Sequence, residues 1–157
     1  MFKFMKSKKG FSLVELMIVV VIMAILVAVA VPIYNSVTAN ARTKTCLDNQ
    51  RTIINSLGNH LMLQGVQIDS AETFYVVTAA DGEGGKYATD SAGQNAVPTS
   101  NVKVTSTMLN AVFQTVPYCP TEGSYIKVVV NPNTEDAASK VVTDCITDGH
   151  ELNSADA

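Results

Sequence analysis

The side chains best suited to metal binding or redox chemistry are three cysteines and two histidines: Cys46, Cys119, Cys145, His60 and His150. In an exported chain, an odd number of cysteines predicts one disulfide plus a remaining thiol, or an intermolecular bond. We expect Cys119 to pair with Cys145, because this bond would close the region of a predicted hairpin. Pairing of Cys46 with either of the other two is the alternative, and it would link the predicted long helix to the head.

A zinc ion held by the three cysteines and His150 would need no further ligand. The sequence has no CxxC or HxxxH ligand pair, however, so we predict no metal and no cofactor. His60 is expected to be capped or solvent-facing. Asp81, Glu83 and Asp90 do not have the spacing of an EF-hand calcium loop, and a solvated loop is expected there.

The sequence has no motif of an enzyme active site. It contains no nucleophile elbow, no phosphate-binding loop and no HExxH pair. We therefore predict that the protein is not an enzyme.

A single carboxylate, Glu15, lies inside an apolar segment that runs to Val31 and Pro32. No residue from Leu16 to Val31 is charged. A charge at membrane depth is costly and is retained only with a partner or a function. We expect Glu15 to meet a positive charge; an interfacial acid that only sets the depth of insertion is the alternative.

Four lysines precede this segment and predict a cytoplasmic N-terminus: Lys3, Lys6, Lys8 and Lys9. With the residues from Phe11 onward, the apolar run is long enough to span a bilayer. A conventional secretory signal cut near Ala28–Ala30 is the alternative. Against it, Gly10 and Phe11 stand at the head of the apolar run and an acid lies within it.

The basic leader, Gly10, Phe11, Glu15 and Pro32 together resemble the N-terminus of type IV pilins and of the related pseudopilins. The resemblance implies that a prepilin peptidase cuts between Gly10 and Phe11 and that Phe11 is then N-methylated. It also implies that Glu15 and Pro32 take part in assembly. The segments 45–53 and 119–125 resemble pilins of Gram-positive anaerobes, although Glu122 replaces the usual second glycine.

The resemblance implies a structural subunit of a type IV pilus, polymerised with itself or with minor pilins by an assembly ATPase and platform proteins. It would reside in the cytoplasmic membrane as a single-pass protein with its N-terminus inside, and in an extracellular filament afterwards. One alternative is a pseudopilin or minor pilin of a type II secretion or competence DNA-uptake system. An alternative of another class is a membrane-anchored binding module that never polymerises.

The charge of the exported part excludes one class of partner. Removing the four positive leader lysines takes the formal net charge from -3 to -7. An acidic chain with 6% aromatic residues has neither a basic face nor a stacking platform, so we expect no specific nucleic-acid binding.

The predicted fold is α+β, with one long N-terminal helix packed on a small antiparallel sheet in a head. We divide the chain into a leader, 1–10, a hydrophobic membrane and filament-core helix, 11–34, and an amphipathic helix half with the globular head, 35–157. The amphipathic half has a stripe that we expect to be buried, formed by Ile33, Val37, Ala41, Leu47, Ile54, Leu57 and Leu61. Gly65 is the expected helix stop.

The head is expected to contain short elements. Residues 125–130 and 140–145 predict a β-hairpin, and 73–78 predict a further strand or a helical extension. Residues 106–114 predict a short helix capped by Ser106. Alternation in the strands is imperfect, so the number of strands stays open.

Overall fold

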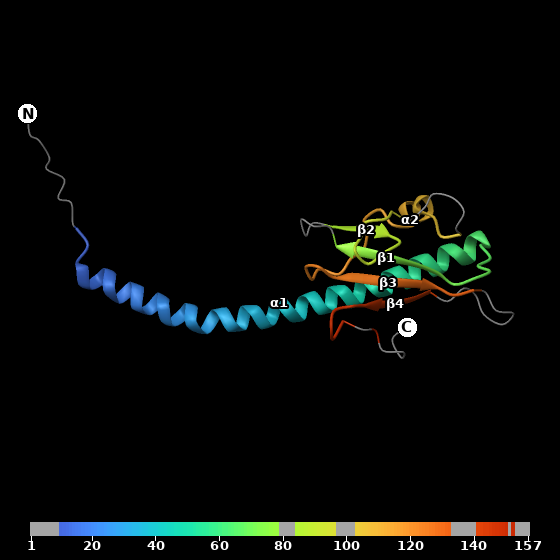
Figure 1. Cartoon of the computed structure of the whole chain (residues 1–157). Helices are drawn as coiled ribbons and strands as arrows, with labels where there is room; N and C mark the ends of the chain where they lie inside the picture. Colours follow the sequence, from blue (N-terminus) through green and yellow to red (C-terminus); the bar gives the residue numbers. More distant parts are fainter. Residues whose placement is uncertain (1–9, 79–83, 97–102, 133–140, 151, 153–157) are drawn as a thin grey trace, which may run out of the picture. The chain divides into compact units, whose positions relative to one another are not determined.

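The structure is a computed structural model that describes residues 10–78, 84–96, 103–132, 141–150 and 152. In this part of the chain the elements, labelled in Figure 1, are α1 (Leu13–Gln64), β1 (Glu72–Thr78), β2 (Gly85–Ala88), α2 (Ser106–Val112), β3 (Tyr125–Val130) and β4 (Val141–Cys145). The contacts divide the chain into two units between Ala39 and Asn40, and we describe each by itself. The leader lysines, Asp81 and Glu83 lie outside the described residues.

The first unit contains the N-terminal half of α1. This half consists mainly of Val, Ile, Leu, Met and Ala residues, and it has no charged residue after Glu15. The helix continues through Pro32. Proline removes one backbone donor, but its ring fixes φ near the helical value. The helix therefore runs through Pro32 without interruption.

The second unit, the head, contains a four-stranded sheet in the order β2-β1-β3-β4. All neighbouring strands are antiparallel: in the central pair Val76 lies opposite Ile126, and in the hairpin Val128 lies opposite Thr143. The predicted hairpin and the strand at 73–78 are both present. The predicted α+β fold, a long helix with a small antiparallel sheet, is confirmed.

The core of the head lies between the C-terminal half of α1 and one face of the sheet (Figure 1). Residues in strands point alternately to the two faces, and the buried set follows this period of two. The sheet contributes Phe74, Val76, Ile126, Val128, Val130, Val141 and Cys145, and α1 contributes Cys46, Ile53, Leu57 and Leu61. Burial of these apolar side chains is what holds α1 against the sheet.

The buried stripe of α1 is shifted by one residue from the predicted one between positions 46 and 54, and the first three predicted members, Ile33, Val37 and Ala41, are exposed. Cys46, Gln50 and Ile53 are buried, whereas Leu47 and Ile54 are only half-buried. Leu57 and Leu61 are buried as predicted, and Gly65 follows the helix with a φ of 60°. The prediction followed the most hydrophobic positions and so passed over Cys46 and Gln50.

Two local details correct the sequence prediction. The N-cap of α2 is Thr105, whose side chain accepts a hydrogen bond from the Met108 amide, and not Ser106. The strand β2 was not predicted, because it has four residues and begins with a glycine. Gly85 is needed there, since a Cβ would lie 2.7 Å from the Cβ of Tyr118.

Candidate functional site

The predicted cleavage bond, between Gly10 and Phe11, precedes α1 and is exposed on both sides. The side chain of Phe11 is 89% exposed. A protease needs accessible backbone, and this bond lies outside the helix with both of its residues exposed.

Glu15 takes part in the cap of its own helix. Its Oε2 accepts a hydrogen bond from the Ser12 backbone N–H at 2.9 Å, and the Ser12 Oγ accepts one from the Val14 N–H at 3.3 Å. This reciprocal arrangement is a capping box, which satisfies backbone donors that the first helical turn leaves without partners. The carboxylate thus binds the backbone N–H of the residue that directly follows Phe11.

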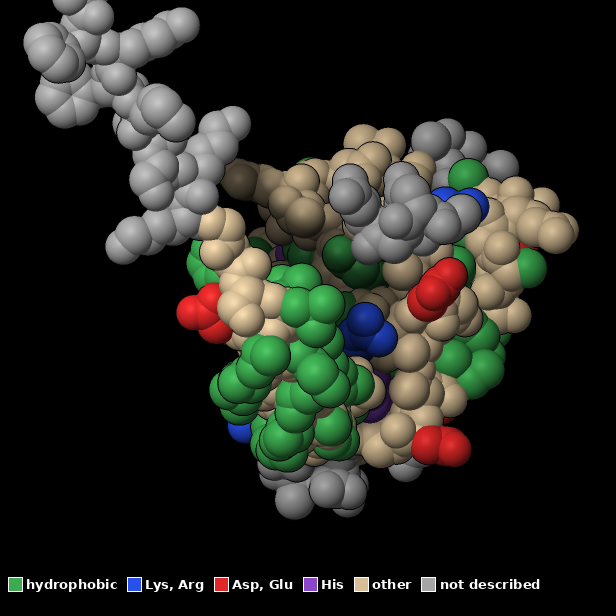
Figure 2. Space-filling model, turned by 90° about the vertical axis from the view of Figure 1, so that its left-hand side faces the viewer, with side chains coloured by type: hydrophobic (Ala, Val, Ile, Leu, Met, Phe, Trp, Pro, Cys, Tyr) green, Lys and Arg blue, Asp and Glu red, His purple; other side chains and the backbone are tan. Residues whose placement is uncertain are grey.

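Apolar side chains cover the N-terminal half of α1 on the side seen in Figure 2, where they are green. Most of these side chains, from Leu13 to Val37, are more than half exposed. Within the described residues, α1 is the one helix long and apolar enough to cross a membrane. A helix that is hydrophobic on every face needs surroundings that are apolar on every face, either lipid or other helices.

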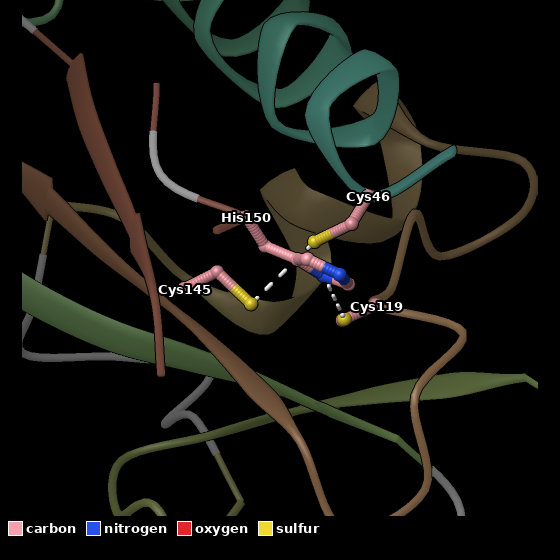
Figure 3. Close-up of side chains that lie close together, drawn as sticks. All are labelled: Cys46, Cys119, Cys145 and His150. Carbon is pink, nitrogen blue, oxygen red and sulfur yellow. Dashed lines mark hydrogen bonds between the residues drawn. The ribbon is translucent and has the colours of Figure 1, made fainter. Parts of the chain in front are cut away.

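A second group of chemically competent side chains lies inside the head (Figure 3). Cys46 comes from α1, Cys119 from the segment before β3, Cys145 from the end of β4, and His150 from the turn that follows β4. Their ligand atoms all lie within 4.8 Å of one another. The Sγ atoms of Cys46 and Cys145 are 3.5 Å apart, and His150 Nδ1 is 3.4 Å from the Sγ of Cys119.

The cluster is buried and its members are held by further hydrogen bonds. The three cysteines and His150 are at most 5% exposed. His150 Nε2 lies 2.9 Å from the Thr43 Oγ1, and the Gln50 side chain donates to the His150 carbonyl at 2.5 Å. Gln50 Nε2 also lies 3.5 Å from the Sγ of Cys46.

The three thiols influence one another's pKa values. Hydrogen bonds from Cys145, then from Cys46, hold the pKa of Cys119 below its ordinary value. Hydrogen bonding to Cys119 raises the pKa of Cys46 and that of Cys145. Hydrogen bonding within the cluster therefore shifts the pKa of Cys119 in the opposite direction to those of Cys46 and Cys145.

The structure brings Cys119 and Cys145 into one cluster, but all three thiols are free. The disulfide between them stays a prediction. His60 lies on α1 and is not a member of the cluster. The sequence analysis considered these four residues as a zinc site and set the site aside for lack of a close ligand pair. It missed the supporting residues Thr43 and Gln50. The position of Gln50, four residues after Cys46 on the same helix, was the signal that could have found it.

Comparison with known proteins agrees with the N-terminal pattern. Residues 5–31 match the family model of the prokaryotic N-terminal methylation motif. Two curated relatives, both fimbrial proteins of Pseudomonas aeruginosa, are each 38% identical over 69 residues. The alignment covers 44% of this chain, and the chain spans 44% of the length of each relative. No solved structure matches the chain.

Proposed function

We propose that this chain is a type IV pilin-like subunit that polymerises into a type IV pilus; the N-terminal methylation motif and the similarity to fimbrial proteins support this. In the proposed sequence, prepilin peptidase cuts after Gly10 and methylates Phe11. The precursor is stored in the cytoplasmic membrane with its N-terminus inside. An assembly ATPase and platform proteins then extract it, and its N-terminal helix, which includes Pro32, bundles with those of other copies.

The observation that carries the proposal is the place of Glu15. It is the sole charged side chain from Phe11 to Ala41, in a helix that is apolar on every face. Burying such a helix among copies of itself also buries the carboxylate, which is strongly unfavourable without a partner. Cleavage before Phe11 creates a cationic amine at the end of every copy.

The position of Glu15 suits a pairing of this kind. Its carboxylate already faces the helix N-terminus, where backbone N–H groups and the helix dipole favour negative charge. A neighbour whose amine enters this region gains a favourable charge pair. A neighbour displaced along the helix leaves both charges buried without partners, so Glu15 selects the axial register.

Glu15→Gln tests the charge separately from the cap. Glutamine keeps an oxygen that can accept from the Ser12 N–H but has no charge, whereas Ser12→Ala removes the hydroxyl cap and keeps the charge. We expect sheared surface fibres to be strongly reduced in the Glu15→Gln strain and close to wild type in the Ser12→Ala strain. Membrane levels of both precursors should be equal by immunoblot. Normal fibre yield from Glu15→Gln would refute the role of the charge.

Intact mass of the natural product separates the alternative functions. A pilin is cut after Gly10, carries one added methyl group and is the bulk protein of sheared fibres. A pseudopilin or minor pilin is cut and methylated but is not the bulk protein of surface fibres. A binding module that never polymerises keeps residues 1–10 or is cut elsewhere.

A further inference from the structure

We propose that the head binds one zinc-type divalent ion through the Sγ atoms of Cys46, Cys119 and Cys145 and the Nδ1 of His150. Zinc sites are tetrahedral, with Zn–S bonds of about 2.3 Å and Zn–N bonds of about 2.0 Å, so neighbouring ligand atoms lie roughly 3.5–3.8 Å apart. Two of the contacts here are 3.5 Å and 3.4 Å, and every pair lies within 4.8 Å. The four donors already surround a space of nearly the required size.

The four donors come from four separate segments of the head. Cys46 lies on α1 and Cys145 on β4, and the other two come from the segments on either side of the β3–β4 hairpin. A bound ion would therefore connect the helix to the sheet at one point. This origin also explains why the sequence shows no CxxC pair: each segment supplies one ligand.

The imidazole of His150 is oriented as a ligand histidine would be. Its Nδ1 faces the cysteine cluster, while its Nε2 lies 2.9 Å from the Thr43 Oγ1. Histidines bound to metals commonly donate their second ring N–H to an oxygen, which fixes the tautomer. With Nε2–H donating to Thr43, Nδ1 keeps the lone pair that a metal needs.

A side-chain N–H group is directed at one of the three sulfurs: the Gln50 amide lies 3.5 Å from the Sγ of Cys46 and donates to it. Three thiolates around one divalent ion leave one net negative charge in a buried place. An N–H group aimed at a sulfur compensates part of that charge.

A disulfide accounts for less of this arrangement. A bond between Cys119 and Cys145 would use two of the four donors. It would leave unexplained why the buried sulfur of Cys46 and the Nδ1 of His150 point to the same place (Figure 3). An ion uses all four, and it also keeps three clustered thiols from oxidation in an exported protein.

Metal titration of the full chain in detergent tests the proposal. The protein is purified with reductant, stripped of metal with a chelator and titrated with Co²⁺, then with Zn²⁺. We expect one equivalent of Co²⁺ with the strong visible d–d bands of tetrahedral geometry and a sulfur-to-cobalt charge-transfer band, both abolished by one equivalent of Zn²⁺. Zinc should also block the reaction of all three thiols with a thiol reagent, and a chelator should restore it. These wild-type measurements need no variant to fold.

Variants then assign the ligands. Cys46→Ser and His150→Ala should lose the stoichiometric cobalt spectrum, whereas the matched control His60→Ala should keep it. Thr43→Val, which removes the partner of Nε2, should weaken zinc affinity about 10- to 100-fold. Two outcomes would overturn the proposal. One is that the fully reduced wild type takes up no stoichiometric metal; the other is that Cys46→Ser binds it as tightly as the wild type.

Discussion

The orientation of α1 against the sheet can be tested with two adjacent isoleucines. The structure buries Ile53 to 1% exposure, while Ile54 is half-buried at the edge of the core. The sequence pattern had favoured Ile54 instead. Ile53→Ala and Ile54→Ala delete the same atoms and change helix propensity equally, so their difference reports burial alone.

The expected magnitudes follow from the two environments. Truncating a fully buried isoleucine to alanine costs about 2–5 kcal/mol of unfolding free energy, because the lost transfer energy and the remaining cavity add. We expect about 3 kcal/mol for Ile53→Ala. Ile54 already has part of its surface in water, so its truncation should cost about 1 kcal/mol.

Urea unfolding of the full chain in nonionic detergent measures the difference. Four of the five tyrosines, Tyr75, Tyr87, Tyr118 and Tyr125, lie in the head, so tyrosine fluorescence follows its unfolding. With a slope of about 1–3 kcal/mol per molar urea, a difference of about 2 kcal/mol separates the midpoints by roughly 1 M. Leu63→Ala, at an 86% exposed position of the same helix, is the control and should shift the midpoint little. Equal midpoints for the two isoleucine variants, or a lower one for Ile54→Ala, would show that α1 presents a different face to the sheet.

Two further predictions concern local contacts of the head. Thr105→Ala removes the oxygen that accepts the hydrogen bond from the Met108 amide, and it should cost about 1 kcal/mol of unfolding free energy in the same assay. Ser106→Ala should cost clearly less. A larger loss for Ser106→Ala would show that Ser106 is the N-cap, as the sequence predicted. Hydrogen bonds, first of all from the Gln94 backbone amide, hold the pKa of Asp90 below its ordinary value. A carboxyl group whose pKa is lower in the folded than in the unfolded state stabilises the folded protein at pH values above the unfolded-state pKa. This contribution is lost as the pH falls through the folded-state pKa. Asp90→Asn should therefore be less stable than wild type at neutral pH and converge with it in acid, and a carbon-detected NMR titration that places the Asp90 pKa at or above its ordinary value would contradict this.

Local signals in the sequence were sufficient for most elements. The apolar run before Pro32, the stop at Gly65 and the strands around Phe74 and Val128 depend on residue type, period and turn chemistry over a few neighbouring positions. The structure agrees with each of them. The short β2 could not be found in this way, because its four residues are a strand only through pairing with β1.

The buried face of α1 was misjudged by one position around Cys46 and Ile53. Each residue of a helix is rotated by about 100° from the one before it, so choosing Leu47 and Ile54 as the inner face turns Cys46 and Ile53 toward the edge. Hydrophobicity alone favoured that choice, since the true face includes Gln50, a polar residue that is buried with its amide hydrogen-bonded. With Cys46 on the inner face, three thiols and His150 meet although they lie as far as 104 positions apart in the chain, from residue 46 to residue 150. The orientation of α1 therefore places Cys46 beside the other three side chains, which a four-ligand centre requires, and the Ile53 and Ile54 variants test this premise of the metal proposal.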